Sequence, residues 1–317
     1  MKTAEANGWI NRVFCEDALL GLARIPDDSV DLILADPPYG LGKDYGNDSD
    51  KQATAEYLRW MAQWIDAALP KLKSTGSLYI FLTWRYSPEV FVMLKQRMSM
   101  INEIIWDRRV PSMGGSVRSY TSVHDTVGFF VKQKGYYFDL DAIRIPYDEE
   151  TKKARSRSIF VGAKWLELGF NPKDVWSVAR LHKEHAERAD HPTQKPLAII
   201  ERMLKASCPV GGIVLDPFMG SGTTAVAAQR CGRRFVGFEL NPDYCKTIAA
   251  RLAAPEAQLA QASNQPTQPV RDKLPANATP KRPRKSKHSK VAAPAEPGLA
   301  KPGPDSSVEL PQTALTF

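Results

Sequence analysis

Apolar side chains along the chain follow two patterns, short runs and longer stretches with helical spacing. Residues 31–35 are almost continuously apolar, which is typical of a strand that is buried on both faces. Residues 55–72 repeat apolar side chains every three or four positions, which predicts a helix with one buried face. Ser87 at a cap position and Pro88 at the first helical position predict the start of another helix.

The same two patterns alternate over most of residues 1–254. Strands interleaved with helices indicate an α/β fold with a mostly parallel sheet of seven strands, covered by helices on both faces. The predicted strands are residues 12–15, 31–35, 77–82, 101–106, 126–131, 213–215 and 235–240, and the remaining predicted helices are 197–207 and 223–231.

Two regions depart from this alternation. Residues 107–190 are irregular and rich in Arg, Ser, Tyr and Trp, so we expect an insertion between two halves of the sheet, residues 1–106 and 191–254. Residues 255–317 are dominated by Pro, Ala, Gln and Lys and include a basic run at 279–290, which predicts a disordered basic tail. Such a tail either keeps the chain in solution or holds nucleic acid non-specifically.

A short motif follows the first buried run, where that strand ends. It reads Asp-Pro-Pro-Tyr, and its two prolines fix the backbone and remove two N–H donors. A carboxylate, free carbonyls and an aromatic ring remain, which together suit a planar amine by accepting its hydrogens and stacking on its ring. An ordinary turn at the end of a strand is the alternative. The candidate catalytic residues are Asp36, Pro37, Pro38 and Tyr39.

A second motif lies far downstream, between a predicted strand and a predicted helix. It begins at Asp216, and Gly220 and Gly222 allow a tight turn and the close approach of a ligand to the backbone. Glu239, at the end of the next predicted strand, is placed to accept hydrogen bonds from ribose hydroxyls. Strand, glycine turn, helix and acidic residue in this order describe a nucleoside-binding unit, with a purely structural turn as the alternative.

Three classes of nucleoside ligand compete for this unit. A phosphate-loop enzyme needs Lys after the second glycine, where this chain has Thr223. A dinucleotide enzyme needs a third glycine, and the Asp216 carboxylate would repel a pyrophosphate. S-adenosylmethionine carries an ammonium, a sulfonium and a ribose but no phosphate, so it fits this charge. Lys195, in the His-Pro-Thr-Gln-Lys-Pro segment at 191–196, is placed to neutralise the carboxylate of that cofactor.

Composition adds weaker constraints. A chain of 317 residues with 43% hydrophobic and 25% charged side chains can form a substantial core. The net charge is +8, and residues 255–317 supply +4 of it from nine Lys/Arg and five Asp/Glu, a mild bias toward polyanions. No apolar stretch is long enough to span a bilayer, and the N-terminus has no secretory signal. The four cysteines are scattered without C-x-x-C spacing, so we expect no disulfide framework, no metal site and a cytoplasmic protein.

With these motifs the chain resembles the permuted, β-type DNA amino-methyltransferases. In that family the Asp-Pro-Pro-Tyr motif comes first, a target-recognition region follows, and Asp-Pro-Phe-x-Gly-Ser-Gly-Thr-Thr comes last, which is the order found here. The opening segment at 15–32, the 191–196 segment and residues 136–144 match as well. The resemblance covers about residues 10–252, and it implies a circularly permuted, Rossmann-like methyltransferase fold with an inserted target-recognition region.

The resemblance also implies roles for the residues that match. Asp36 and the carbonyl of Pro37 would accept hydrogens from the target amine, and Tyr39 would stack on a base that has left the duplex. On the cofactor side, Asp17 would bond the adenine and Glu239 the ribose of S-adenosylmethionine. The implied cofactor-binding residues are Asp17, Thr193, Lys195, Asp216, Phe218, Gly220, Ser221, Gly222, Thr223, Thr224 and Glu239.

The substrate that the resemblance implies is double-stranded DNA, methylated at the N6 amine of a flipped adenine. Asp as the first residue of the Asp-Pro-Pro-Tyr motif favours adenine within the family. N4-cytosine methylation on the same scaffold is the closest alternative, followed by RNA or protein methylation and by a DNA-binding relative that has lost catalysis. Family members often dimerise, so the resemblance alone suggests a homodimer. No nuclease motif is apparent, so any restriction endonuclease partner would be a separate chain.

We expect residues 107–190 to read the DNA sequence. Arg side chains bind guanine edges and, more often, phosphates. The region holds 15 Lys/Arg against 12 Asp/Glu, an excess of only +3. The alternative for each basic residue is therefore that it is a solvated charge on the surface and contacts no DNA. The candidate DNA-contacting residues are Arg108, Arg109, Arg118, Arg155, Arg157 and Lys164.

Overall fold

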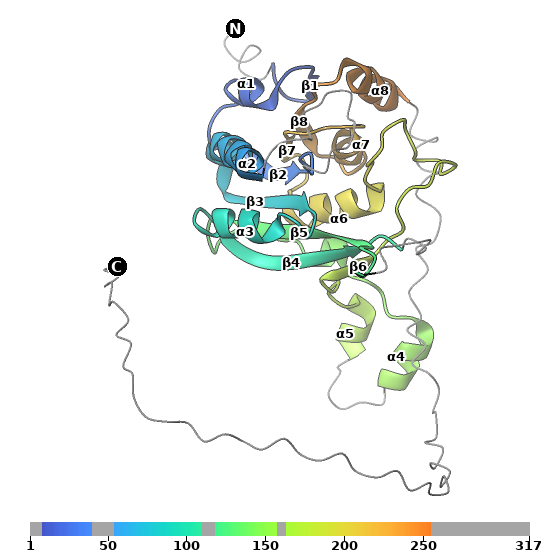
Figure 1. The fold of residues 1–317 in the computed structure, drawn as a ribbon. Helices are drawn as coiled ribbons and strands as arrows, with labels where there is room; N and C mark the ends of the chain where they lie inside the picture. Colours follow the sequence, from blue (N-terminus) through green and yellow to red (C-terminus); the bar gives the residue numbers. More distant parts are fainter. Residues whose placement is uncertain (1–7, 40–53, 110–117, 157–162, 255–317) are drawn as a thin grey trace, which may run out of the picture. The chain divides into compact units, whose positions relative to one another are not determined.

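The computed structural model describes residues 8–39, 54–109, 118–156 and 163–254 (Figure 1). Within them, one mixed sheet has the strand order β1-β8-β7-β2-β3-β5-β4-β6. The first five strands of this order, β1-β8-β7-β2-β3, pair with one another in parallel. β5 is antiparallel to both of its neighbours, β3 and β4, and β6 is parallel to β4. The strands are β1 (Arg12–Phe14), β2 (Val30–Ala35), β3 (Leu72–Leu82), β4 (Ser99–Asp107), β5 (His124–Val131), β6 (Val175–Ser177), β7 (Ile213–Asp216) and β8 (Arg234–Phe238).

Helices pack on both faces of this sheet, as the sequence predicts. The α-helices of the described residues are α1 (Ala18–Leu22), α2 (Thr54–Ala68), α3 (Ser87–Lys95), α4 (Glu149–Arg155), α5 (Ala163–Leu168), α6 (Leu197–Ser207), α7 (Thr223–Arg230) and α8 (Pro242–Ala253). Successive side chains of a strand point to opposite faces. Ile33 and Ile80 therefore lie in a core with α1, α2 and α3, whereas Leu34 and Phe81 lie in a second core with α6, α7 and α8.

The sheet has eight strands where the sequence predicts seven, because β6 extends it beyond β4. β6 pairs in parallel with the end of β4, from Ile105 to Asp107. A strand of three residues is too short to leave a periodic signal in the sequence. Both β5 and β6 come from within residues 107–190, so part of the predicted insertion belongs to the main sheet.

The boundary between α2 and β3 also differs from the prediction. The helix ends at Ala68 rather than at residue 72, and a short 3-10 turn, Leu69–Lys71, follows. Pro70 lies in that turn, and its missing N–H and its ring prevent the helix from continuing. β3 then begins at Leu72, five residues before the predicted strand at 77.

Smaller shifts affect two element ends. Ser87 is the first residue of α3, and Tyr86 holds the cap position predicted for Ser87. β8 ends at Phe238, so Glu239 follows the strand instead of ending it. Element ends are set by caps and local packing more than by periodicity, which explains shifts of this size.

The connections after β2 and β7 leave the sheet in opposite directions. β2 leads through α2 on one face to β3, and β7 leads through α7 on the other face to β8. The two strands are neighbours, with Ile33 opposite Leu215, so the loops after them share one edge of the sheet. Ligands of open α/β sheets bind in the crevice at such a switch point.

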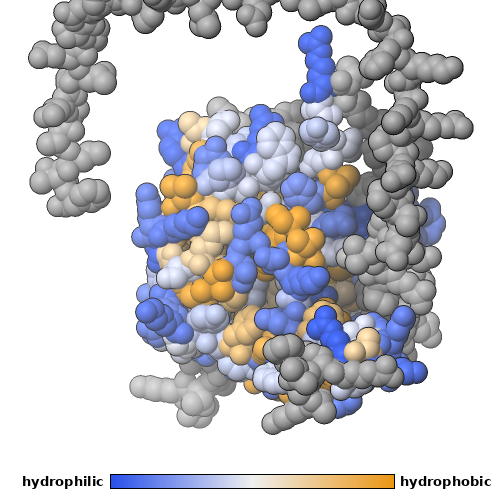
Figure 2. Space-filling model, turned by 90° about the horizontal axis from the view of Figure 1, so that it is seen from below, coloured by the Kyte–Doolittle hydropathy of each residue, from blue (hydrophilic) through white to orange (hydrophobic). Residues whose placement is uncertain are grey.

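The described surface mixes apolar and hydrophilic side chains. On the face seen from below, orange apolar patches lie among blue hydrophilic ones (Figure 2). Across the described ranges, we find no helix with the length and apolar character that crossing a bilayer requires. Residues 255–317, for which the sequence predicts a disordered basic tail, lie outside the described residues.

Candidate active site

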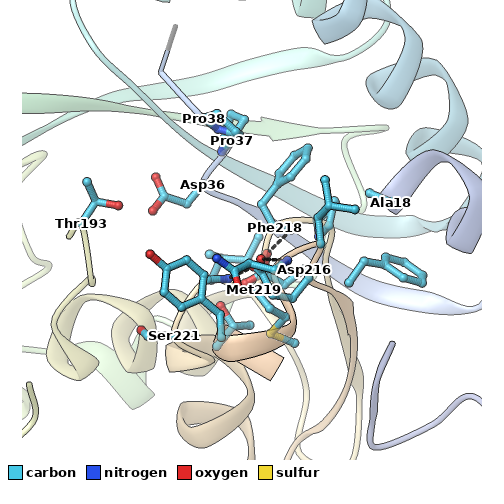
Figure 3. Close-up of a pocket in the computed structure, with 18 of the residues that line it drawn as sticks. Ala18, Asp36, Pro37, Pro38, Thr193, Asp216, Phe218, Met219 and Ser221 are labelled. Carbon is cyan, nitrogen blue, oxygen red and sulfur yellow. Dashed lines mark hydrogen bonds between the residues drawn. The ribbon is translucent and has the colours of Figure 1, made fainter. Parts of the chain in front are cut away.

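A pocket at the switch point brings the two motifs together. Asp36, Pro37 and Pro38 follow β2, and Asp216 to Met219 leave β7 on another side of the same pocket (Figure 3). Thr193 contributes from the segment before α6. The candidate catalytic and cofactor-binding residues all line the pocket, with the exception of Gly222. The two signatures, far apart in the sequence, therefore share one cavity.

The Asp-Pro-Pro-Tyr backbone is held by a tyrosine from α2. The Tyr57 hydroxyl donates to the Pro38 carbonyl oxygen at 2.9 Å, and its ring lies 4.6 Å from the Tyr86 ring. Tyr57 is 3% exposed. Because neither proline has an N–H to anchor the loop, this bond from a neighbouring helix fixes its path and leaves the Pro37 carbonyl for a ligand.

Asp36 is paired with Lys195 in the middle of the pocket. The two side chains meet at 2.5 Å between Nζ and Oδ2, and they are 6% (Lys195) and 20% (Asp36) exposed. Burial raises the pKa of Asp36 above its ordinary value, while the ammonium of Lys195 and a hydrogen bond from Tyr39 oppose the rise. Asp125 on β5 adds to the rise by repulsion. The carboxylate is thus held by a cation in an otherwise unfavourable site.

Asp216 is a buried carboxyl group that also lines the pocket. Its Oδ1 accepts a hydrogen bond from the Phe218 N–H at 2.9 Å. Burial raises the pKa of Asp216 to about 7, hydrogen bonds from Thr224 and Phe218 oppose the rise, and the carboxylates of Asp36 and Glu239 add to it. Three carboxyl groups around one cavity favour a ligand that carries positive charge.

The glycine turn depends on two positive φ angles. Gly220 has φ of 52° and Gly222 of 79°. A Cβ on Gly220 would lie 2.9 Å from the His191 ring, and one on Gly222 would lie 2.8 Å from the Ile248 side chain. Gly222 therefore shapes the turn without lining the pocket. Arg251 of α8 secures the turn by donating to the Ser221 carbonyl oxygen at 2.5 Å.

Two acidic residues at the rim hold the backbone around the pocket. The Glu239 carboxylate accepts the Gly220 N–H at 2.7 Å through Oε2 and the Asn241 N–H at 2.8 Å through Oε1. Burial raises the pKa of Glu239, and these N–H groups oppose the rise. Asp17 caps α1 by accepting the Leu19 N–H at 2.8 Å. Each carboxylate oxygen has a second lone pair, so both groups can still accept from a ligand.

Comparison with known proteins decides the family. The family model for N6/N4 DNA methylases matches residues 30–251. The chain is 36% identical over 243 residues to the type II methyltransferase M.HpaI of Haemophilus parainfluenzae, covering 76% of this chain and 74% of that protein. It is 34% identical over 242 residues to the DNA adenine methyltransferase YhdJ of Escherichia coli K12, covering 74% and 80%. The chain belongs to the N6/N4 DNA methylase family.

Solved structures agree with this fold. The S-adenosylmethionine complex of M1.HpyAVI superposes on the methylase with a TM-score of 0.51 at 24% identity, over 76% of this chain and 98% of that one. The cytosine-N4-specific PvuII DNA methyltransferase gives 0.58 at 19% identity, over 79% and 90%. The mixed α/β sheet of the methylase is therefore that of solved DNA methyltransferases.

As a member of this family, the methylase uses S-adenosylmethionine, and the pocket has the chemistry to hold it. The carboxyl groups of the buried Asp216 and the half-buried Glu239 suit its positive charges and its ribose hydroxyls. Phe218 offers a ring surface, backed by Trp60 at 5.4 Å and Trp64 at 5.2 Å between ring centroids. Trp60 and Trp64 line the pocket too, and neither stands out in the sequence because on α2 their spacing fits an ordinary buried helix face.

Other pocket residues went unnoticed because they belong to no motif. Tyr57 fits the helical period of α2, and Tyr244 lies on α8, where nothing in the sequence marks its side chain. The Tyr244 ring meets the His191 ring at 4.6 Å, and both line the pocket. Of these two residues only His191, the first residue of the 191–196 segment, gave a signal in the sequence.

The candidate DNA-contacting residues that the structure describes differ in their surroundings. The guanidinium of Arg108 lies 3.4 Å from Asp125 and donates to the Ser122 carbonyl oxygen at 2.9 Å, so its partners are internal. Arg109, Arg118 and Arg155 are exposed. Arg157 and the side chain of Lys164 lie outside the described residues.

Proposed function

We propose that the methylase transfers a methyl group to the N6 amine of a flipped adenine in double-stranded DNA at a specific sequence. The observation that supports this most is the shared cavity, in which the Asp36 carboxylate lies beside the Asp216–Thr224 loop. One of the relatives carries the name DNA adenine methyltransferase. Cytosine N4 is the second candidate, because its amine offers the same hydrogens to the same acceptors.

The chain contributes mainly position and electrostatics. An exocyclic amine is a poor nucleophile because its lone pair is delocalised into the ring. Asp36 and the Pro37 carbonyl oxygen, as acceptors out of the ring plane, favour a pyramidal nitrogen whose lone pair is free to attack. Bound S-adenosylmethionine would supply a methyl group on a positively charged sulfur: the N–C bond would form as the S–C bond breaks, a neutral thioether would leave, and the proton lost by the nitrogen would pass to Asp36 or to solvent. Holding the two reactants in line in a site of low polarity accounts for most of the rate.

Tyr39 is proposed to receive the flipped base. Extrusion of a base from the duplex costs a few kcal/mol, and stacking on an aromatic ring offsets about 1–3 kcal/mol of it. Tyr39 follows Pro38 at the pocket wall and is 5% exposed, so its ring is already held in place. Asp17 and Glu239 are proposed to bond the adenine and ribose of the cofactor, and Thr193 to lie near its carboxylate.

Asp36→Asn tests this function directly. The amide keeps an oxygen for Lys195 but replaces the anionic acceptor, so we expect methyl transfer to fall by at least about a hundredfold. Calorimetric titration should show that the variant still binds S-adenosylmethionine, since Asp216 and Glu239 are intact. If the variant loses cofactor binding together with activity, Asp36 serves the structure of the pocket and the proposed role is wrong.

A further inference from the structure

The side chain of Lys195 is buried in the wall of the pocket. It donates to Asp36 Oδ2 at 2.5 Å, and the Thr193 carbonyl oxygen lies at 3.5 Å. Its other neighbours are faces of aromatic rings, which attract a cation. The ring centroids lie 5.2 Å (Tyr39), 5.1 Å (Phe81) and 6.0 Å (Trp106) from Nζ.

These partners coincide with the place proposed for the target amine. Asp36 is the acceptor for the amine, and Tyr39 is the ring for its base. The ammonium of Lys195 already donates to that acceptor and lies over that ring. A protonated amine of the chain thus occupies the position that an amine of the substrate requires.

We propose that Lys195 is the resident partner of Asp36, replaced there by the entering amine, and so a positioning residue of the base-binding half of the pocket rather than a ligand of the cofactor carboxylate. This inference rests on the proposed function. The exchange gives one donor for another, so Asp36 keeps a hydrogen-bond partner throughout. A base that presents a carbonyl oxygen has no hydrogen to give, so it would displace the ammonium without replacing its hydrogen bond to Asp36, which sites of this kind reject strongly.

The charges around Asp36 make Lys195 its main support. Lys195 is the cation in direct contact with it. Asp125 on β5 and Asp216 on β7 are the carboxylates that face it. Asp125 is itself paired with Arg108 at 3.4 Å. Removal of the Lys195 charge would leave Asp36 buried among carboxylates, and its pKa would rise further.

Two substitutions at Lys195 separate charge from contact. Lys195→Gln keeps a donor and loses the charge, whereas Lys195→Arg keeps the charge. Lys205→Gln is the matched control, because it makes the same change in a lysine that also forms an ion pair. Lys205 and its partner Glu201 both lie on α6. Single-turnover methyl transfer is measured against pH for each variant, cofactor affinity is measured by calorimetry, and thermal melting reports folding.

Activity that needs ionised Asp36 is lost as pH falls through the pKa of that carboxyl group. For Lys195→Gln we expect the acid limb of the rate profile to move up by about one pH unit or more, with the rate recovering at alkaline pH. Lys195→Arg and Lys205→Gln should keep the wild-type limb, and cofactor affinity should stay at the wild-type value in Lys195→Gln. Lys195→Met gives the same comparison if the Gln variant does not fold.

The opposite pattern overturns the inference. A weaker cofactor affinity in Lys195→Gln, about tenfold or more, with an unmoved acid limb would assign Lys195 to the cofactor carboxylate. Failure of the proposed function looks different, because the unaltered methylase would then transfer no methyl group to adenine in any DNA, whatever residue stands at 195.

Discussion

At the scale of single residues, the two aspartates Asp36 and Asp216 of the pocket differ in what surrounds them. Asp36 has a cation at contact distance, whereas Asp216 is bonded by the Phe218 N–H and by Thr224. An ion pair stabilises the charged form of a carboxyl group more than neutral hydrogen bonds do. Ionisation of Asp216 would therefore gain from a bound cation, as expected for its proposed place beside a positively charged cofactor.

This difference predicts a pH-dependent cofactor affinity. Burial raises the pKa of Asp216 to about 7, and the anion attracts the cofactor more than the neutral acid does. The affinity should therefore rise between about pH 6 and pH 8 and level off above, with at most about a tenfold change for each unit below the pKa. Calorimetric titration across this range checks it. Asp216→Asn should bind more weakly without that slope, and a flat profile for the unaltered protein would refute the assignment.

At the scale of elements, the site depends on the alignment of β2 with β7. One side chain joins these strands at their amino ends. Asp31 of β2 accepts the buried Ile213 N–H of β7 at 2.9 Å through Oδ2, and accepts from Lys73 of β3 at 2.8 Å through Oδ1. Because the pocket lies at the other ends of the same two strands, this bond supports the site from a distance.

We expect Asp31→Ala to lower the free energy of unfolding by about 1–3 kcal/mol, because a buried N–H loses its acceptor. Urea denaturation measures the loss. The matched control is Asp66→Ala, which removes the ion pair between Asp66 and Arg97, where the Asp66 side chain is 55% exposed. Exposed pairs contribute little, about 0–1 kcal/mol. Equal losses in the two variants would show that the Asp31 bond does not support the sheet.

Elements with a long apolar period were predictable, and short or irregular ones were not. α6 has the bounds that its pattern predicts, 197–207, because its apolar side chains recur over three turns. β6 is too short for a period, and α4 and α5 lie in the segment expected to be irregular. The break at Pro70 was visible in the sequence, but the start of β3 directly after it was not.

At the scale of the whole molecule, the sequence predicted which motifs meet but not how their side chains pair. Order along the chain and the rules for α/β sheets place residues 36–39 and 216–224 at one edge. The pairing of Lys195 with Asp36 joins residues 159 positions apart, and it depends on the path of the segment before α6. The DNA-reading residues were the least predictable, since contacts in a groove depend on three-dimensional placement.

The central claim is that one pocket holds a methyl donor against the N6 amine of adenine. The most direct measurement incubates the purified protein with methyl-labelled S-adenosylmethionine and double-stranded DNA, digests the DNA and identifies the labelled nucleoside. We predict N6-methyladenine as the labelled product, and its loss in Asp36→Asn. Label in N4-methylcytosine, or in no nucleoside of the DNA, would contradict the account.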